Sequence, residues 1–330
     1  MPQVPADRTI TTVSDALFAP DADHGVSLAV VVVRGGEVIH ERYGHQPPSI
    51  FGPGGPVTAD TALISWSMAK SIVHAATGIL VGDGALDLDA PAPVAAWRGT
   101  AKQDITLLQL LEMRSGLHFV EDYEDPATSN CLAMLFGDGA ADMAAYAADQ
   151  PLDHAPGDVW NYASGTTNII CRILGDIVGG GRAGMEAFLR DRLFEPAGMT
   201  AARADFDQAG TFVGSSYVHA TARDFARFGE LYRHDGLAGG RRVLPAGWAA
   251  HAATQVAVDP ENGLGYGRHW WLFPSLPGSL ACCGYEGQHI IVVPERELVV
   301  VHLGKVPADR IDELRALLVA LVEGVSPAAR

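Results

Sequence analysis

The sequence predicts an α/β protein of the α+β type, in which an antiparallel sheet built from both chain ends is flanked by helices. Two observations predict this fold class. Segments rich in β-branched residues lie near both termini, and the apolar spacing between them becomes helical. Helices packed beside a sheet bury the apolar faces of both kinds of element. We therefore expect a sheet domain and a mostly helical lobe inserted into it.

The N-terminal part of the sheet is a predicted hairpin. Residues 27–33, SLAVVVV, and residues 38–44, VIHERYG, are separated by a short segment that contains two glycines. Two apolar or alternating runs around a glycine turn are typical of antiparallel strands.

The central part of the chain shows helical spacing with Pro and Gly punctuation between segments. The predicted helices cover residues 65–81, 104–114, 138–149, 165–178, 184–194 and 221–235. We expect residues 63–261 to form the mostly helical domain. Residues 1–62 and 262–330 would form the discontinuous sheet domain, with the active site in the cleft between the two.

The C-terminal part returns to strands. Residues 279–304 contain three β-rich runs broken by GYEG and PERE, and residues 310–324, RIDELRALLVALVEG, read as an amphipathic helix. The sheet is thus expected to be completed by the end of the chain.

Composition excludes several classes of function. A formal net charge of −16 disfavours nucleic acid and anionic membranes as partners. No basic segment followed by an apolar one opens the chain, which indicates a cytoplasmic protein. The four cysteines lack metal-ligand spacing and favour reduced thiols. We expect no cofactor and no metal, and the sequence leaves the oligomeric state open.

A rare lysine marks the candidate site. Only three lysines occur, at positions 70, 102 and 305, among 23 basic residues. Lys70 lies in an apolar helix, three residues after Ser67, so both side chains share one face. A desolvated lysine can lose its proton whereas arginine cannot, so the pair predicts a serine nucleophile with an amine base. Ser65 is the expected N-cap of this helix. The alternative is a structural lysine that extends its charge to solvent.

A second motif, PGDVWNYASGTTN at residues 156–168, supplies Tyr162 and Ser164 in a turn-rich approach to a helix. By itself Tyr162 suits a core aromatic. Beside Ser67 and Lys70 it can shuttle a proton, because a neighbouring ammonium lowers the pKa of a phenol. Ser164 is expected to support that network by hydrogen bonding.

With these motifs the chain resembles serine hydrolases of the class C β-lactamase-like, penicillin-recognising family, and most closely its 6-aminohexanoate-dimer hydrolase and family VIII esterase branch. The resemblance covers most of the chain. Further similar segments, in order, are LLQLLEMRSGLHFVEDYEDP, LFEPAGMTAARADFD, TARDFARFGELYRHDGLAGGRRVLPAGW, GLGYGRHWW and GYEGQHIIVVPERELVVV. The resemblance implies the fold, an acyl-enzyme route and the nucleophile role of Ser67.

One motif departs from the β-lactamase pattern. Where that family has a Lys-Thr-Gly strand, residues 281–288 read ACCGYEGQ. The missing lysine shifts the prediction from β-lactams toward amides or esters. The resemblance also implies an oxyanion hole made by the backbone N–H groups of Ser67 and Tyr285.

The loop VEDYEDPATSN, residues 120–130, resembles a substrate-covering loop in the dimer-hydrolase branch, with Tyr123 at the covering position. Its carboxylates, together with Glu286, would make the cleft mouth acidic and attract amino-bearing substrates. A solvated acidic loop is the alternative.

The predicted function is a cofactor-free serine hydrolase that acts through an acyl-enzyme on a small-molecule amide or ester. Two rivals remain. One is a different substrate on the same fold, as in a weak β-lactamase or a D-amino-acid peptidase. The other is a ligand-binding or sensor protein without turnover.

Overall fold

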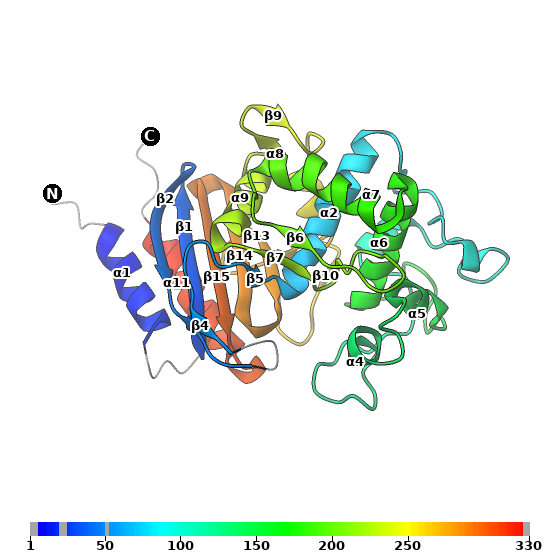
Figure 1. The fold of residues 1–330 in the computed structure, drawn as a ribbon, viewed down its shortest axis with the longest axis horizontal. Helices are drawn as coiled ribbons and strands as arrows, with labels where there is room; N and C mark the ends of the chain where they lie inside the picture. The colour runs from blue at the N-terminus through cyan, green and yellow to red at the C-terminus, as the bar shows by residue number, and fades with distance from the viewer. Residues whose placement is uncertain (1–5, 20–24, 50–52, 326–330) are drawn as a thin grey trace.

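The computed structural model describes residues 6–19, 25–49 and 53–325 and contains one large antiparallel sheet (Figure 1). Its eight strands run in the order β10-β11-β12-β13-β14-β15-β1-β2. They are β1 Val26–Arg34, β2 Glu37–Tyr43, β10 Ala257–Val258, β11 Gly265–Tyr266, β12 Trp271–Leu272, β13 Leu280–Gly284, β14 Gln288–Val293 and β15 Leu298–Lys305. The predicted sheet from both chain ends is confirmed, since β1 lies between β2 and β15.

The predicted N-terminal hairpin is formed by β1 and β2. Gly35 and Gly36 join the strands with φ angles of +58° and +87°. Two consecutive positive φ angles match the twist of a two-residue hairpin turn and are readily adopted only by glycine.

Successive side chains of β1 point to opposite faces of the sheet and are buried on both. Val30 and Val32 pack in a cluster with α1 (Ala6–Leu17) and α11 (Ile311–Gly324), whereas Val31 and Val33 belong to the core on the opposite face. On that opposite face, α9 (Ala222–Arg233) contacts β1, β14 and β15. The period of two in strand burial therefore fixes a layered arrangement with helices on both sides.

The remaining helices include α5, α6 and α7, which lie farther from β1 than α9 does (Figure 1). They are α2 Ala69–Gly82, α3 Leu107–Leu111, α4 Asn130–Phe136, α5 Met143–Asp149, α6 Ser164–Val178, α7 Gly181–Phe188, α8 Glu195–Ala197 and α10 Trp248–Ala252, with a π-helical segment at Leu189–Phe194. Three small sheets pair β3 His45–Gln46 with β4 Gly55–Pro56, β5 Leu63–Ile64 with β7 Val218–Ala220 and β6 Arg203–Ala204, and β8 Leu237–Ala238 with β9 Arg241–Arg242.

The division into two domains stays a prediction. Two elements inside residues 63–261, α9 and β10, belong to the layers of the large sheet. In the described part of the chain, no helix has both the length and the apolar character needed to span a bilayer.

The start of α2 lies where several distant segments meet. A short 3₁₀ turn, η1 (Trp66–Met68), precedes α2 and contacts β13 and β14, while α2 itself packs on α6. The end of β13 and the beginnings of α2 and α6 therefore surround one region of the molecule.

Burial of histidines predicts acid-sensitive stability. Burial lowers the pKa of His251 to about 4 and the pKa of His269 and His289 to about 3, and it holds the pKa of His74 well below its usual value. In the unfolded chain these side chains have a pKa of about 6.5. Their contribution to the free energy of unfolding is therefore complete above that pH and is lost as pH falls toward the folded values.

We accordingly expect the melting temperature to fall between pH 7 and pH 5, above the range in which carboxylates take up most of their protons. Calorimetry or circular dichroism measures this directly. His251→Gln should reduce the fall, because it removes one of the four groups. A melting temperature that is constant over this range would contradict the histidine account.

Candidate active site

Ser67 lies in the η1 turn, immediately before α2. The α-helix begins at Ala69, so Ser67 precedes its first regular turn, although it remains three residues from Lys70. The predicted N-cap role of Ser65 is wrong. The Ser65 hydroxyl instead donates to Trp66 O at 2.9 Å and accepts from Val218 N at 3.1 Å, which ties the turn to β7.

Lys70 is buried and surrounded by oxygen atoms. Its side chain is 2% exposed, and its Nζ lies 2.9 Å from Ser67 Oγ, 2.9 Å from Ser164 Oγ and 3.0 Å from Ser215 O. Burial lowers the pKa of Lys70, and the nearby Glu121 carboxylate opposes this effect. The alternative of a lysine that extends to solvent is excluded for Lys70 by its burial.

The partners of Lys70 determine the direction of its hydrogen bonds. The carbonyl of Ser215 can only accept, and Ser164 Oγ donates its own hydrogen to Glu121 and therefore accepts from Nζ. A neutral amine has two N–H groups and one lone pair. In this neutral form, with both N–H groups on these acceptors, the lone pair would face Ser67 Oγ, whereas the protonated amine donates to Ser67 Oγ at 2.9 Å.

Glu121 anchors this network from the loop before α4. Its carboxylate accepts from Ser164 N at 2.7 Å, from Ser164 Oγ at 2.5 Å and from Tyr123 OH at 2.8 Å. Glu121 was expected in an acidic cleft mouth. It does line a cavity at Ser67, but its carboxylate is bonded to Ser164 and Tyr123. Asp122 accepts from backbone N–H groups of its own loop, at Glu124 and Asp125.

The Tyr162 ring lies next to the Lys70 amine. Its ring centroid is 4.9 Å from Lys70 Nζ, and it packs on Trp271 at 5.4 Å and Tyr266 at 5.8 Å. The expected lowering of the Tyr162 pKa is wrong in direction. Burial raises its pKa well above 10, and hydrogen bonding with Ser67 only partly offsets that effect. Tyr162 is therefore a protonated phenol at neutral pH.

The end of β13 is held against the nucleophile turn. A Cβ atom on Gly284 would collide with the Ser65 carbonyl oxygen and would lie 3.2 Å from the Ser67 amide nitrogen. Because glycine has no Cβ, the chain at residue 284 can pass close to the nucleophile turn, and this brings Tyr285 next to Ser67. The two backbone N–H groups remain our candidates for an oxyanion hole.

Glu286 is engaged by other residues of the protein. It accepts from Trp66 Nε1 at 3.1 Å and forms an ion pair with Lys305, a residue that sequence analysis did not select. Both Trp66 (φ +44°) and Glu286 (φ +59°) adopt left-handed backbone conformations, which non-glycine residues rarely do. Such strain often accompanies functional sites.

Two cavities meet at Ser67. The larger, about 630 Å³, is lined by Tyr162, Trp160, Asp259 and Arg315 among others, and the smaller, about 170 Å³, lies beside α4. Both are lined by Ser67, Tyr123, Tyr285 and Glu286. The structure thus brings together every predicted site residue: Ser67, Lys70, Tyr162 and Ser164 form one network, and the other three line the cavities around it.

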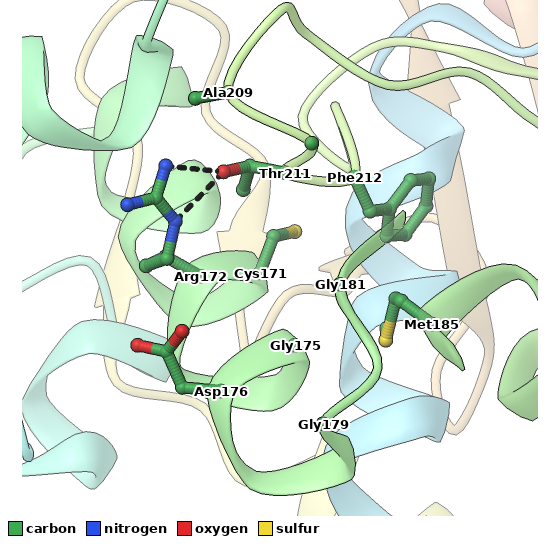
Figure 2. A pocket seen from close by; sticks show the side chains of 11 residues that line it. Cys171, Arg172, Gly175, Asp176, Gly179, Gly181, Met185, Ala209, Thr211 and Phe212 are labelled. Carbon is green, nitrogen blue, oxygen red and sulfur yellow. Dashed lines mark hydrogen bonds between the residues drawn. The ribbon is translucent and has the colours of Figure 1, made fainter. Parts of the chain in front are cut away.

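A third cavity of about 260 Å³ lies beside the C-terminal half of α6, and none of the predicted site residues lines it (Figure 2). The guanidinium of Arg172 donates to Thr211 Oγ1 (Figure 2). It also forms an ion pair with Asp142, so its charge is compensated. Among the residues that the structure describes, no group of three or more His, Cys, Asp or Glu side chains is placed to hold a metal ion. The cleft at Ser67 is therefore the candidate active site.

A comparison with protein families matches residues 14–323 to the Beta-lactamase family model. The chain belongs to the Beta-lactamase family. It is 26% identical to a 6-aminohexanoate-dimer hydrolase of Paenarthrobacter ureafaciens, over 93% of this chain and 80% of that protein.

Solved structures show the same fold. A Bacillus anthracis protein provisionally described as a 6-aminohexanoate-dimer hydrolase has a TM-score of 0.76 at 24% identity, covering 92% of this chain and 79% of the other. A family VIII carboxylesterase has a TM-score of 0.72 at 16% identity, covering 98% of this chain and 97% of the other. A class C β-lactamase has a TM-score of 0.69 at 15% identity, with 99% of both chains covered.

The network around Lys70 predicts a shift in pH dependence for Glu121→Gln. The Glu121 charge raises the pKa of Lys70, so its removal should lower that pKa further. A reaction of Ser67 that needs the neutral amine becomes faster as pH rises through this pKa. We therefore expect the midpoint of the rate of Ser67 labelling by a fluorophosphonate to move to lower pH.

The matched control is Glu124→Gln, because Glu124 is an exposed carboxylate on the same loop. It should leave the midpoint in place. Equal midpoints for Glu121→Gln and the parent protein would show that Glu121 does not affect the pKa of Lys70.

Proposed function

We propose that this protein is a serine hydrolase that cleaves an amide or ester bond of a small molecule through an acyl-enzyme on Ser67. Relatives described as 6-aminohexanoate-dimer hydrolase and carboxylesterase support this reaction class. The S-x-x-K motif then comprises Ser67 as nucleophile and Lys70 as its base.

The observation that carries the proposal is the set of three contacts made by Lys70. Burial favours the neutral amine, and two acceptors, Ser164 Oγ and Ser215 O, take its two N–H groups. The remaining contact is with Ser67 Oγ at 2.9 Å, within the range required for proton transfer. A binding or sensor protein would not need a titratable amine at this position.

The first step is attack of Ser67 Oγ on the substrate carbonyl. The hydroxyl proton passes to Lys70 Nζ, a C–O bond forms, and the carbonyl electron pair moves onto oxygen. The N–H groups of Ser67 and Tyr285 are the proposed donors to this oxyanion. One such donor typically contributes about 3 kcal/mol to transition-state stabilisation.

The second step is departure of the leaving group. The carbonyl re-forms, the bond to the leaving nitrogen or oxygen breaks, and that atom takes the proton of Tyr162. The Lys70 ammonium then returns a proton to Tyr162, so both groups are neutral again. In deacylation, water attacks the acyl carbon and gives its proton to Lys70, which passes a proton back to Ser67 Oγ.

The end of β13 favours amides and esters over β-lactams. Cys283 and Gly284, which occupy the stretch where the β-lactamase pattern has Lys-Thr-Gly, line the large cavity. Neither residue carries a cation for a β-lactam carboxylate, and the arginine that lines the same cavity, Arg315, is paired with Asp312. A panel of p-nitrophenyl esters, nitrocefin and short ω-amino amides separates these substrate classes.

Ser67→Ala should abolish both turnover and fluorophosphonate labelling, because it removes the attacking oxygen. It should leave thermal unfolding nearly unchanged, since Ser67 is partly exposed in the cleft. Intact mass spectrometry gives the labelling stoichiometry. A mass shift that persists in the variant would move the nucleophile to another residue.

Lys70→Arg replaces an amine that can accept a proton with a guanidinium that stays protonated, and so removes the base. We expect kcat/KM to fall on the order of 10² to 10⁴, the usual contribution of general base catalysis. Lys102→Arg is the matched control: this partly buried lysine donates to Ala148 O and should tolerate the exchange. A folded Lys70→Arg protein that keeps more than about a tenth of the parental kcat/KM would refute the base role.

A further inference from the structure

The smaller cavity beside Ser67 differs chemically from the larger one. It is lined by Cys131, Leu132, Leu135 and Phe136 of α4. The helix begins at the Ser129 cap, whose Oγ accepts from Leu132 N at 2.9 Å. Because residues three and four apart share a helix face, these four side chains form one apolar wall.

Several polar groups around the small cavity are already bonded within the protein. Glu286 is paired with Lys305 and Trp66, and Tyr123 OH donates to Glu121. Ser216 Oγ is 3.1 Å from Ser215 Oγ. A charged group placed here would lose hydration and would meet a carboxylate whose charge is already compensated.

The position of Tyr162 orients a substrate across Ser67. Tyr162 lines the large cavity and does not line the small one. Under the proposed reaction Tyr162 gives a proton to the leaving atom, so the leaving group lies in the large cavity. The acyl group then points in the other direction, toward α4.

We infer that the small cavity between Ser67 and α4 is an acyl subsite for short, uncharged aliphatic acyl chains. This inference rests on the proposed function and specifies its substrate class. A volume of about 170 Å³ limits the chain length, whereas the cavity of about 630 Å³ admits a larger and more polar leaving group. Chains that are too long, or that carry a terminal charge, should be poor substrates.

The test is kcat/KM for p-nitrophenyl esters of acetate, butyrate, hexanoate, octanoate and decanoate. Each methylene that enters an apolar pocket adds roughly threefold to fourfold. We expect a rise to butyrate or hexanoate and a fall of at least about tenfold by decanoate. Rates that do not vary with chain length, or that are highest for decanoate, would overturn the subsite.

A charged ester of matched length sharpens the test. The p-nitrophenyl ester of 6-aminohexanoate should react at least about tenfold more slowly than the hexanoate ester, because its terminal ammonium finds no free anion in the pocket. An equal or faster rate would overturn the assignment to uncharged chains and would favour Glu286 as an amine ligand.

Variants of Leu132 test the location. Leu132→Phe fills the cavity and should move the optimum toward acetate, whereas Leu132→Ala should move it toward longer chains. Ile311→Phe is the matched control, because Ile311 lines only the large cavity and is partly buried like Leu132. It should leave the acyl preference unchanged. If neither Leu132 variant changes the preferred acyl chain length, the acyl group binds elsewhere.

The outcomes also separate this inference from the proposed function. Turnover of the esters with the wrong chain-length profile would overturn the acyl subsite alone. Absence of turnover for every ester, with no acylation of Ser67 in intact mass spectra, would overturn both.

Discussion

The structure depends on one interaction, the solvation of a buried lysine amine by three protein oxygens. Removing an amine from water favours its neutral form. A neutral amine still needs acceptors for its N–H groups, and Ser164 and Ser215 provide them. In that neutral form, the contact left for the lone pair is the one with Ser67 Oγ, 2.9 Å away. Under the proposed mechanism, the burial that makes Lys70 a base therefore also orients it.

The fold supplies these oxygens from distant segments. Ser67 precedes α2, Ser164 begins α6, Ser215 precedes β7 and Glu121 comes from the loop before α4. The sheet contributes β13, whose last residue, Gly284, is packed against the nucleophile turn. Because the packing of these elements sets the geometry, the site is held by the same core that stabilises the protein.

Sequence predicted the parts of the fold that have a strong local period. The hairpin of β1 and β2 and the strands β13 to β15 follow from alternating or continuous apolar runs with turn residues between them. Helix α4 was missed, because its seven residues are too few to show a period and follow a loop that reads as acidic. The pair Ser67 and Lys70 was accessible from the sequence because the two residues are only three positions apart.

Contacts between distant residues were not accessible from sequence. Glu121 lies 43 positions before Ser164, and nothing in its loop indicates that its carboxylate bonds to that residue. The pKa of Tyr162 was given the wrong sign because the sequence shows the nearby cation, whereas the stronger effect, burial, depends on packing by Tyr266 and other residues. Lys305 was not selected as a site residue, because Lys305 and its partner Glu286 come together only when the sheet forms.

The most direct measurement is a titration of the Lys70 amine itself. With only three lysines in the chain, selective ¹³Cε labelling gives three NMR signals, and a variant without Lys70 identifies the relevant one. The account predicts that the Lys70 signal titrates below the ordinary lysine range, at the pH where Ser67 acylation reaches half its maximal rate. A Lys70 amine that stays protonated at pH values where Ser67 already reacts at its full rate would contradict it.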